Sequence, residues 1–262
     1  MADIVLVHGT TQTAAGFAPL VAELRDRGHR ALTVDVPSAA ASTAEAYAGL
    51  LAAQLPADLD RPVVVAHSAA GLLLPSLARR LNARHQVWLA AAVGDYAGQR
   101  GFLTEVRQDP TAVVHEEWLG ADPTGDPVLA TYFLFHDANL AALRQALPTV
   151  SLCDLSAVYA EIPTVDPAAV PSTYVLPTGD RTLTPAWMAK VARERLHLKP
   201  VEIPGSHNFY AASPDTAAAL ISRAVVMDAV PARTSTSMSG SVITPYRSFR
   251  LATSLRGTSG VT

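Results

Sequence analysis

The chain has 262 residues, 49% of them hydrophobic, and a formal net charge of −3. This length and composition fit one sizeable globular domain with an ample core, whereas the mildly acidic balance, without runs of like charge, argues against partners such as nucleic acid or a membrane surface. The start of the chain leaves no room for a secretory leader, and Cys153 has no second cysteine with which to form a disulfide, so we expect a cytoplasmic protein. We expect Cys153 to be a small core residue rather than a reactive thiol.

Apolar runs alternate with helical patterns through the first part of the chain. The expected strands are 4–7, 31–36, 63–65 and 87–93, and the expected helices are 17–27, 43–55 and 72–81. Nearly continuous apolar strands separated by amphipathic helices are typical of a parallel sheet that is covered on both faces. The sequence therefore predicts an α/β fold with a mostly parallel sheet flanked by helices.

The strand rhythm stops between residues 95 and 163, where helical stretches are interrupted by prolines. The expected helices are 102–108 and 128–147; strands over 173–176 and 200–203 and helices over 185–196 and 214–226 follow. Because ligands bind beyond the carboxyl ends of the strands in open α/β sheets, we expect residues 95–163 to form an inserted helical cap. Residues 1–94 and 164–228 would then form the core.

Residues 229–262 differ from the rest in composition, since Ser, Thr and Gly make up close to half of them and arginines are their only charges. No helical period is visible in this segment. We therefore expect a disordered tail, with a peptide-docking or phosphorylated tail as the alternative.

A serine stands at the junction between an expected strand and an expected helix. The strand 63–65 leads into Ala66-His67-Ser68-Ala69-Ala70-Gly71, so that Ser68 is hemmed by small residues. This pattern is typical of a nucleophile elbow, a sharp turn that exposes the hydroxyl, although Ala66 and Ala70 replace the usual glycines.

A serine nucleophile needs a base and a group that orients the base. Asp180 and His207 each follow an expected strand, as Ser68 does, and parallel strands bring such ends to one edge of the sheet. The chain order Ser, Asp, His is that of the α/β-hydrolases. We therefore predict Ser68, Asp180 and His207 as the catalytic residues. Asp95 is the alternative acid, and His67, next to the nucleophile, is interpreted as packing in the elbow.

Backbone amides would stabilise the oxyanion of a tetrahedral intermediate. One comes from the residue after the nucleophile, Ala69, and the other from an early loop. The strand 4–7 ends in His8-Gly9-Thr10, and a glycine there would let the loop turn close to the serine. Thr10 is therefore the predicted second donor.

These motifs resemble the α/β-hydrolase fold superfamily, and within it the small bacterial esterase-like relatives of the plant methylesterase and hydroxynitrile lyase group. The resemblance rests on residues 5–9, 66–71, 180–185 and 205–207 and extends over about residues 3–228. It implies a Ser-His-Asp set, a helical cap, no metal and no cofactor. Lyases of this group place a lysine directly after the catalytic histidine, where this chain has Asn208, so the resemblance disfavours lyase chemistry.

The expected cap is rich in aromatic residues, which would either line a cleft for an acyl or aromatic substrate or form the core of the cap itself. His136 and Asp137 fall inside the expected helix 128–147, where they would either bind a polar group or lie on an exposed face. The histidines of the chain are scattered without the spacing of zinc ligands.

We therefore predict a serine hydrolase that cleaves a small-molecule carboxylic ester, lactone or thioester through an acyl-enzyme on Ser68. Two alternatives stay open. One is a non-hydrolytic enzyme, such as a lyase or cofactor-independent oxygenase, in which His207 acts as a base without acylation. The other is a receptor-like protein that binds its ligand without turnover.

Overall fold

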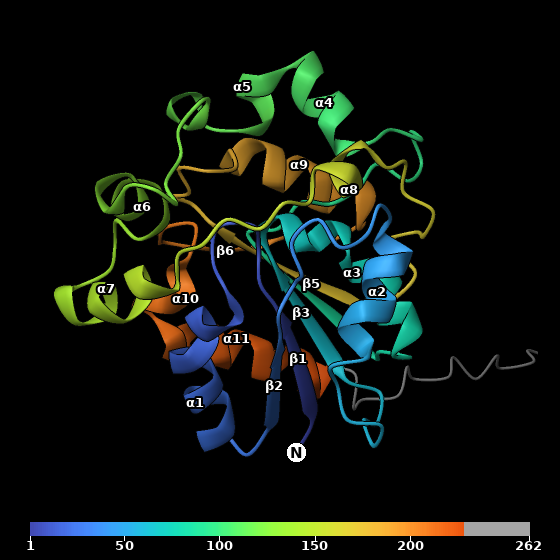
Figure 1. The fold of residues 1–262 in the computed structure, drawn as a ribbon. Coiled ribbons are helices and arrows are strands. Elements are labelled where there is room, and N and C mark those ends of the chain that lie inside the picture. Colours follow the sequence, from blue (N-terminus) through green and yellow to red (C-terminus); the bar gives the residue numbers. More distant parts are fainter. Residues whose placement is uncertain (228–262) are drawn as a thin grey trace, which may run out of the picture. The chain divides into compact units, whose positions relative to one another are not determined.

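Six strands form one parallel sheet in the described part of the chain, residues 1–227 of a computed structural model (Figure 1). The strand order is β2-β1-β3-β4-β5-β6, and each of the five neighbouring pairs is parallel. The strands are β1 (Asp3–Val7), β2 (Arg30–Val34), β3 (Val63–His67), β4 (His85–Leu89), β5 (Ser172–Pro177) and β6 (Val201–Ile203). The predicted α/β class is therefore confirmed, while the predicted tail, residues 229–262, lies outside the described residues.

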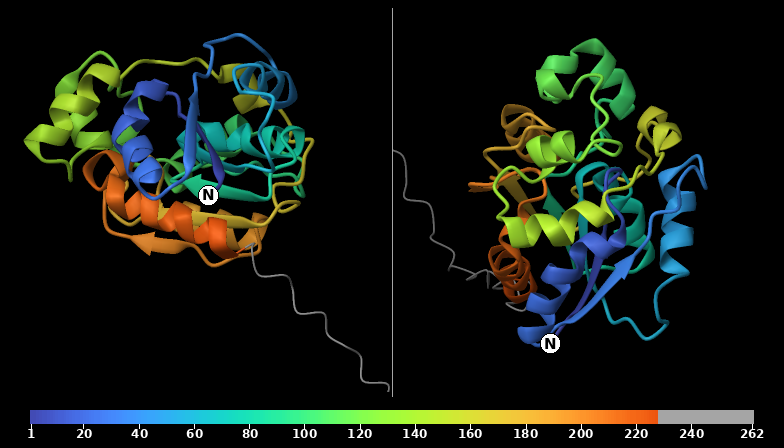
Figure 2. Two further views of the ribbon diagram at one scale, coloured as in Figure 1. Left: turned by 90° about the horizontal axis from the view of Figure 1, so that it is seen from below. Right: turned by 60° about the vertical axis from the view of Figure 1, so that its left-hand side comes forward.

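The two faces of the sheet bury two separate apolar clusters. In β1, Ile4 and Leu6 belong to one cluster and Val5 and Val7 to the other, as the period of two along a strand requires. Helices cover both faces, with α1 (Ala18–Asp26), α10 (Phe209–Ala212) and α11 (Pro214–Met227) on the side of Ile4 and α2 (Ala44–Ala52), α3 (Leu74–Arg80) and α9 (Pro185–Arg195) on the side of Val5. Figure 2 shows α1 and α11 side by side.

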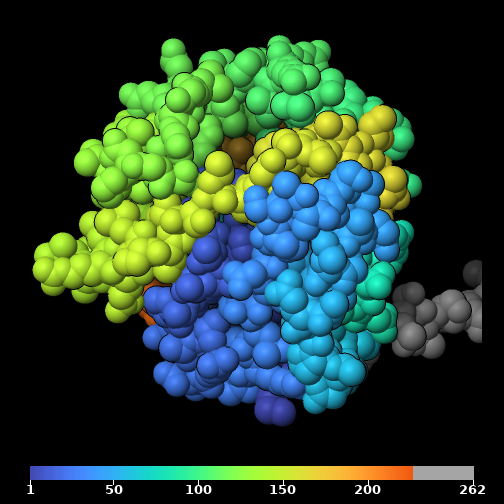
Figure 3. Space-filling view, viewed as in Figure 1, coloured from blue at the N-terminus to red at the C-terminus, as the bar shows by residue number. Residues whose placement is uncertain are grey.

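Five helices occupy the chain between β4 and β5, and we call them, with their connections, the cap. They are α4 (Phe102–Gln108), α5 (Pro110–Val113), α6 (Pro127–Leu134), α7 (Leu140–Ala146) and α8 (Ser156–Ala160). In Figure 1, α4, α5, α6 and α8 lie beyond the carboxyl ends of the strands, whereas α7 lies beside α10. Figure 3 shows green and yellow parts of the cap against the blue N-terminal part of the chain. This helical insertion lies where the sequence predicts it, and its exact boundaries stay a prediction.

Four short 3₁₀ helices complete the secondary structure of residues 1–227. They are η1 (Ala14–Phe17), η2 (Ser68–Leu72), η3 (Glu116–Trp118) and η4 (Leu147–Thr149).

Two predicted elements differ in the structure. The predicted strand 87–93 ends at Leu89, because Ala90 has a φ of +44° that no strand residue adopts. The predicted helix 128–147 is two helices, α6 and α7. The side chain of Asn139 accepts a hydrogen bond from the Ala142 amide at 3.0 Å and thereby caps a new helix start.

Backbone pairing joins the cap to two loops at the edge of the sheet. The Cys153 amide donates to the carbonyl of Thr10 at 2.8 Å, in the loop after β1. The His115 amide donates to the carbonyl of Thr182 at 2.9 Å, in the loop after β5. The cap is therefore held at both sides of the place where the sequence predicts the catalytic residues.

Candidate active site

Ser68 lies at the turn between β3 and η2. Its φ is +55°, in the left-handed region that residues with a side chain rarely adopt. Small neighbours make the turn possible: a methyl group on Gly71 would lie 2.1 Å from the carbonyl oxygen of Ala92, and one on Gly9 would lie 2.6 Å from Ser68 Cβ. This is the strained strand-to-helix turn that the sequence predicts at Ser68.

His207 connects Ser68 to Asp180. His207 Nε2 lies 2.9 Å from Ser68 Oγ, and His207 Nδ1 lies 2.7 Å from Asp180 Oδ2. Since an ionised carboxylate only accepts, Nδ1 carries a proton and donates it, and Nε2 is left to accept from the Ser68 hydroxyl. The structure thus brings together the three residues that the sequence singles out, and their catalytic roles are taken up below as a proposal.

Backbone amides hold the Asp180 carboxylate in place. Asp180 Oδ1 accepts hydrogen bonds from the amides of Thr182 at 2.6 Å and Leu183 at 3.0 Å. With one oxygen held in this way, the other is directed at His207. The side chain of Asp180 is therefore oriented before any ligand binds.

The alternative acid, Asp95, faces another partner. Arg100 Nε donates to Asp95 Oδ2 at 2.8 Å, and the Gly98 amide donates to Asp95 Oδ1 at 2.9 Å. In the described residues Asp95 makes no hydrogen bond to His207, which contacts Asp180 instead. The geometry therefore favours Asp180 over Asp95 as the partner of the histidine.

The buried ring of His8 holds the loop that follows β1. The Val36 amide donates to His8 Nε2 at 2.8 Å, so the proton lies on Nδ1, which donates to the Gly9 carbonyl at 2.7 Å. Burial lowers the pKa of His8 and so favours this neutral form. Because carbonyl and amide point in opposite directions across a trans peptide, this contact turns the Thr10 amide away from His8.

The two predicted oxyanion donors border the same cavity as Ser68. Thr10, Ser68 and Ala69 all line it. The Ala69 amide lies in the first turn of η2, where amides have no partner within the helix. Among residues 1–227 the Thr10 amide donates to no other group. Both amides are thus available to a ligand, and their role as oxyanion donors stays a prediction.

The cavity next to Ser68 has a volume of about 360 Å³ and no charged side chain in its wall. The cap supplies much of this wall through Phe102, Leu103, Val106, Trp118, Leu119 and Tyr159. Apolar walls with a few polar groups are typical of small-molecule sites. The cavity is therefore suited to an uncharged ligand.

Sequence comparison gives the family of the chain. The profile of the alpha/beta hydrolase family matches residues 4–220. The chain belongs to this family. No curated protein sequence matches it.

Solved structures of several α/β-hydrolases are similar to this one in fold. A pyrethroid hydrolase from Sphingobium faniae JZ-2 is 17% identical, with a TM-score of 0.70, and the match covers 88% of this chain and 98% of that one. Polyneuridine aldehyde esterase is 16% identical, with a TM-score of 0.68 over 85% of this chain and 98% of the other. A methylesterase from Arabidopsis is 17% identical, with a TM-score of 0.63 over 87% of this chain and all 100% of that one.

In this α/β-hydrolase the ring of His67 packs against the ring of His207. The two rings lie 4.7 Å apart, and His67 Nε2 is 3.1 Å from the His207 carbonyl oxygen, to which it donates. His67 is fully buried and also packs edge-on against Tyr210 at 5.0 Å. The side chain therefore supports His207 rather than serving Ser68, in agreement with its interpretation as packing.

A buried network that the sequence does not reveal joins the loop after β1 to the loop of His207. Gln12 Oε1 accepts from Asn208 Nδ2 at 2.8 Å and from the Tyr210 hydroxyl at 2.6 Å. Gln12 Nε2 donates to Thr149 Oγ1 at 2.7 Å in the cap. Asn208 is fully buried in this network and does not line the cavity.

His136 and Asp137 contact the loops that carry Asp180 and His207, and the prediction that places them inside a helix is wrong. They lie between α6 and α7. His136 Nε2 donates to the Gly179 carbonyl at 2.8 Å, and Asp137 Oδ2 accepts from the Ser206 amide at 3.0 Å. The two cap residues therefore hold the residues directly before Asp180 and His207. The only sequence feature that indicates a helix break near His136 and Asp137 is Asn139, because asparagine is a strong helix-capping residue.

Cys153 is buried, as predicted. Its thiol lies 3.4 Å from the Val36 carbonyl oxygen, and burial raises its pKa to about 11. A thiol of this kind is protonated at neutral pH and therefore a poor nucleophile.

Residues 1–227 lack two further features. No group of three His, Cys, Asp or Glu side chains there is arranged to hold a metal ion. None of the helices in the same range combines the length and the hydropathy that crossing a bilayer requires.

Proposed function

We propose that this protein is a serine hydrolase that cleaves a small, uncharged carboxylic ester, lactone or thioester. The observation that carries this proposal is the continuous line of hydrogen bonds from Ser68 through His207 to Asp180, at 2.9 Å and 2.7 Å, with the serine on the wall of an apolar cavity. Family membership supports the same reaction class.

In the proposed reaction His207 Nε2 takes the proton of the Ser68 hydroxyl as Oγ attacks the carbonyl carbon. The amides of Thr10 and Ala69 donate to the oxyanion that forms. As the intermediate collapses, His207 protonates the departing alcohol or thiol, and the acyl group stays on Ser68. Water then attacks this acyl-enzyme and loses a proton to His207, which passes it to Ser68 Oγ as the acid is released. Asp180 keeps His207 in the tautomer that both steps need.

The substrate class is inferred from the cavity and from the relatives. Because no charged side chain lines the cavity, an ionised group on the substrate would lose its hydration without gaining a partner. The names of similar structures, a pyrethroid hydrolase, an aldehyde esterase and a methylesterase, support esters as the substrate type. The cytoplasmic location stays a prediction from the sequence.

Hydrolysis is favoured over the two alternatives. Lyases of the related group use a lysine after the histidine, and here Asn208 is buried and donates to Gln12. A protein that only binds its ligand has no need of a base held 2.9 Å from a hydroxyl.

The test is covalent trapping of the nucleophile. A fluorophosphonate should label the folded protein once, at Ser68, as located by mass spectrometry of its peptides. Ser68→Ala should abolish both labelling and turnover of a panel of p-nitrophenyl esters, whereas Ser42→Ala, at an exposed serine, serves as the control. An unlabelled Ser68 in excess reagent contradicts the proposal. Turnover that survives in Ser68→Ala would favour the non-hydrolytic alternative, and binding of esters without turnover would favour the receptor-like one.

A further inference from the structure

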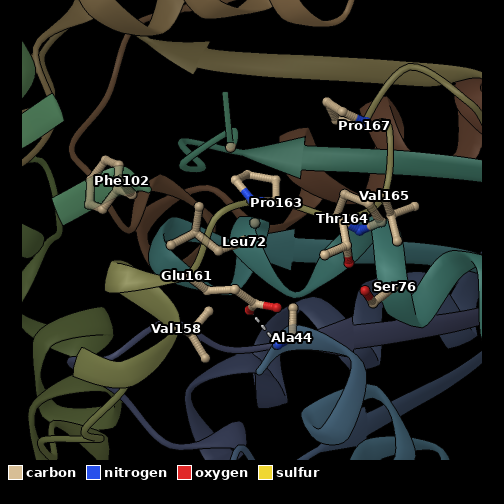
Figure 4. A pocket seen from close by; sticks show the side chains of 13 residues that line it. Ala44, Leu72, Ser76, Phe102, Val158, Glu161, Pro163, Thr164, Val165 and Pro167 are labelled. Atoms are coloured by element: carbon tan, nitrogen blue, oxygen red, sulfur yellow. Dashed lines mark hydrogen bonds between the residues drawn. The ribbon is translucent and has the colours of Figure 1, made fainter. Parts of the chain in front are cut away.

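A second, smaller cavity lies beside the Ser68 cavity. It has a volume of about 30 Å³ and lies between the start of α3 and the segment that leads from the cap back to β5 (Figure 4). Leu72, Val158, Pro163 and Val165 supply apolar parts of its wall. The Glu161 carboxylate also borders it and accepts a hydrogen bond from the Ala44 amide at 2.6 Å.

Among the described residues, Phe102 is the one side chain that borders both cavities. Figure 4 shows its ring at one end of the small cavity, away from Pro167 and Val165. The same ring is also part of the wall of the cavity that contains Ser68. Phe102 therefore belongs to the walls of both cavities.

The position of Phe102 is fixed by close packing. Its ring packs against Tyr159 with the centroids 5.6 Å apart and against Trp187 at 5.8 Å. Trp187 is held in turn, because its Nε1 donates to Glu105 at 2.9 Å. The backbone at Gly101, the residue before Phe102, is also closely packed, since a methyl group there would lie 2.7 Å from the Ala160 carbonyl oxygen. These contacts hold the ring in place, although it is only partly buried.

We propose that Phe102 sets the length of the apolar arm that a substrate of this enzyme can carry. The inference rests on the proposed function only in placing the substrate at Ser68. An unbranched arm that grows from the reacting carbonyl along the Ser68 cavity ends against the ring. Each methylene buried before that point adds affinity, and a methylene beyond it adds none. Without the ring, the arm would continue beside Leu72, Val158 and Pro163, whose apolar surfaces suit it.

The decisive measurement is ligand binding without turnover. Calorimetry with the Ser68→Ala protein and a series of methyl esters, from methyl acetate to methyl decanoate, should show affinity rising about fourfold per methylene, which corresponds to about 0.8 kcal/mol, up to a plateau. In Ser68→Ala with Phe102→Ala the plateau should move to longer chains, and Phe102→Leu should give an intermediate position. Leu103→Ala, which enlarges only the Ser68 cavity, is the matched control and should leave the plateau length in place.

Turnover is measured in parallel with p-nitrophenyl esters of increasing acyl length and with alkyl acetates of increasing alcohol length, which report the two possible directions of the arm. A plateau that stays at the same length in both Phe102 variants, or that moves equally in Leu103→Ala, overturns the proposal. The binding series does not depend on catalysis. A wild-type protein that hydrolyses none of the esters would therefore contradict the proposed function, and the role of Phe102 would still be decided by binding.

Discussion

The side chain of Asn208 donates a 2.8 Å hydrogen bond to the side chain of Gln12, 196 residues away in the sequence. Asn208 directly follows the proposed base His207, and Gln12 lies two residues after the proposed oxyanion donor Thr10. One buried contact therefore links the loop of the proposed base to the loop of the proposed oxyanion donor. In the proposed reaction, the relative position of these loops affects the transition state more than the binding of substrate.

Gln12→Ala should lower kcat more than it raises KM. The change removes the acceptor shared by Asn208 and the Tyr210 hydroxyl. Asn208 Nδ2 keeps its 3.2 Å hydrogen bond to the Tyr210 hydroxyl, but one of its N–H groups loses its partner, at a cost of about 1–3 kcal/mol. Steady-state kinetics and denaturant unfolding report the two effects, with Gln145→Ala at an exposed position as the control. An unchanged kcat in a destabilised Gln12→Ala protein would show that the network supports stability alone.

Asp180→Asn should lower kcat by roughly 10⁴-fold while the fold persists. The amide oxygen of asparagine can still accept from the Thr182 and Leu183 amides, which turns the NH₂ group toward His207. His207 Nδ1 must then accept, so Nε2 carries the proton and cannot receive one from Ser68.

Asp95→Asn is the matched control for this substitution. Its carboxylate pairs with Arg100, and the change should affect stability more than kcat. A large loss of kcat in Asp95→Asn together with a small loss in Asp180→Asn would reverse the assignment of the acid.

The positions of residues at strand ends were predictable, because a parallel sheet brings the carboxyl ends of its strands to one edge. Ser68 and Asp180 each follow a strand whose apolar run is visible in the sequence, and His207 follows the short strand β6, Val-Glu-Ile. Parallel pairing leaves little freedom in where the ends of these strands lie. The glycine at position 9 was predictable for a similar reason, since close approach of a loop to the elbow excludes a side chain.

The partners of these residues were not predictable, because no local pattern encodes them. Gln12 is an ordinary polar residue in the sequence, and its burial depends on contacts with Asn208 and Thr149. His136 and Asp137 were obscured by a helical pattern that continues through them, whereas tertiary contacts with the loops after β5 and β6 end α6 before them. Local propensity is a weak guide where such contacts compete with it.

The buried ring of His67 should make stability depend on pH. Burial lowers the pKa of His67 well below its ordinary value, and the nearby His207 lowers it further. Between the lowered folded value and the unfolded value near 6.5, the unfolded chain binds a proton that the folded chain does not. Stability contributed by the neutral ring is therefore complete above about pH 6.5 and is lost progressively as the pH falls below it.

His67→Phe keeps the ring but removes this titration. Its free energy of unfolding, from urea titrations at several pH values, should fall less steeply below about pH 6.5 than that of the wild type, by about 1.4 kcal/mol per pH unit for one proton. His197→Asn, at an exposed position, is the matched control. Equal slopes for His67→Phe and the wild type would mean that the ring does not resist protonation.

Gly9→Ala should reduce activity without unfolding the protein. The added methyl group would lie 2.6 Å from Ser68 Cβ and 3.2 Å from Ser68 Oγ, so the loop after β1 or the serine itself must move. Either movement misplaces the Thr10 amide relative to Ser68, and loss of one oxyanion donor typically costs about 10²–10³-fold in kcat.

Gly49→Ala is the control for adding a methyl group at a glycine. Its methyl group would lie in ordinary contact, 3.8 Å from Arg80, within α2. It should keep full activity and gain about 0.5–1 kcal/mol of stability from the higher helix propensity of alanine. Full activity in Gly9→Ala would mean that the loop after β1 accommodates the added methyl group without moving the catalytic groups. It would then contradict the assignment of the Thr10 amide as the second oxyanion donor.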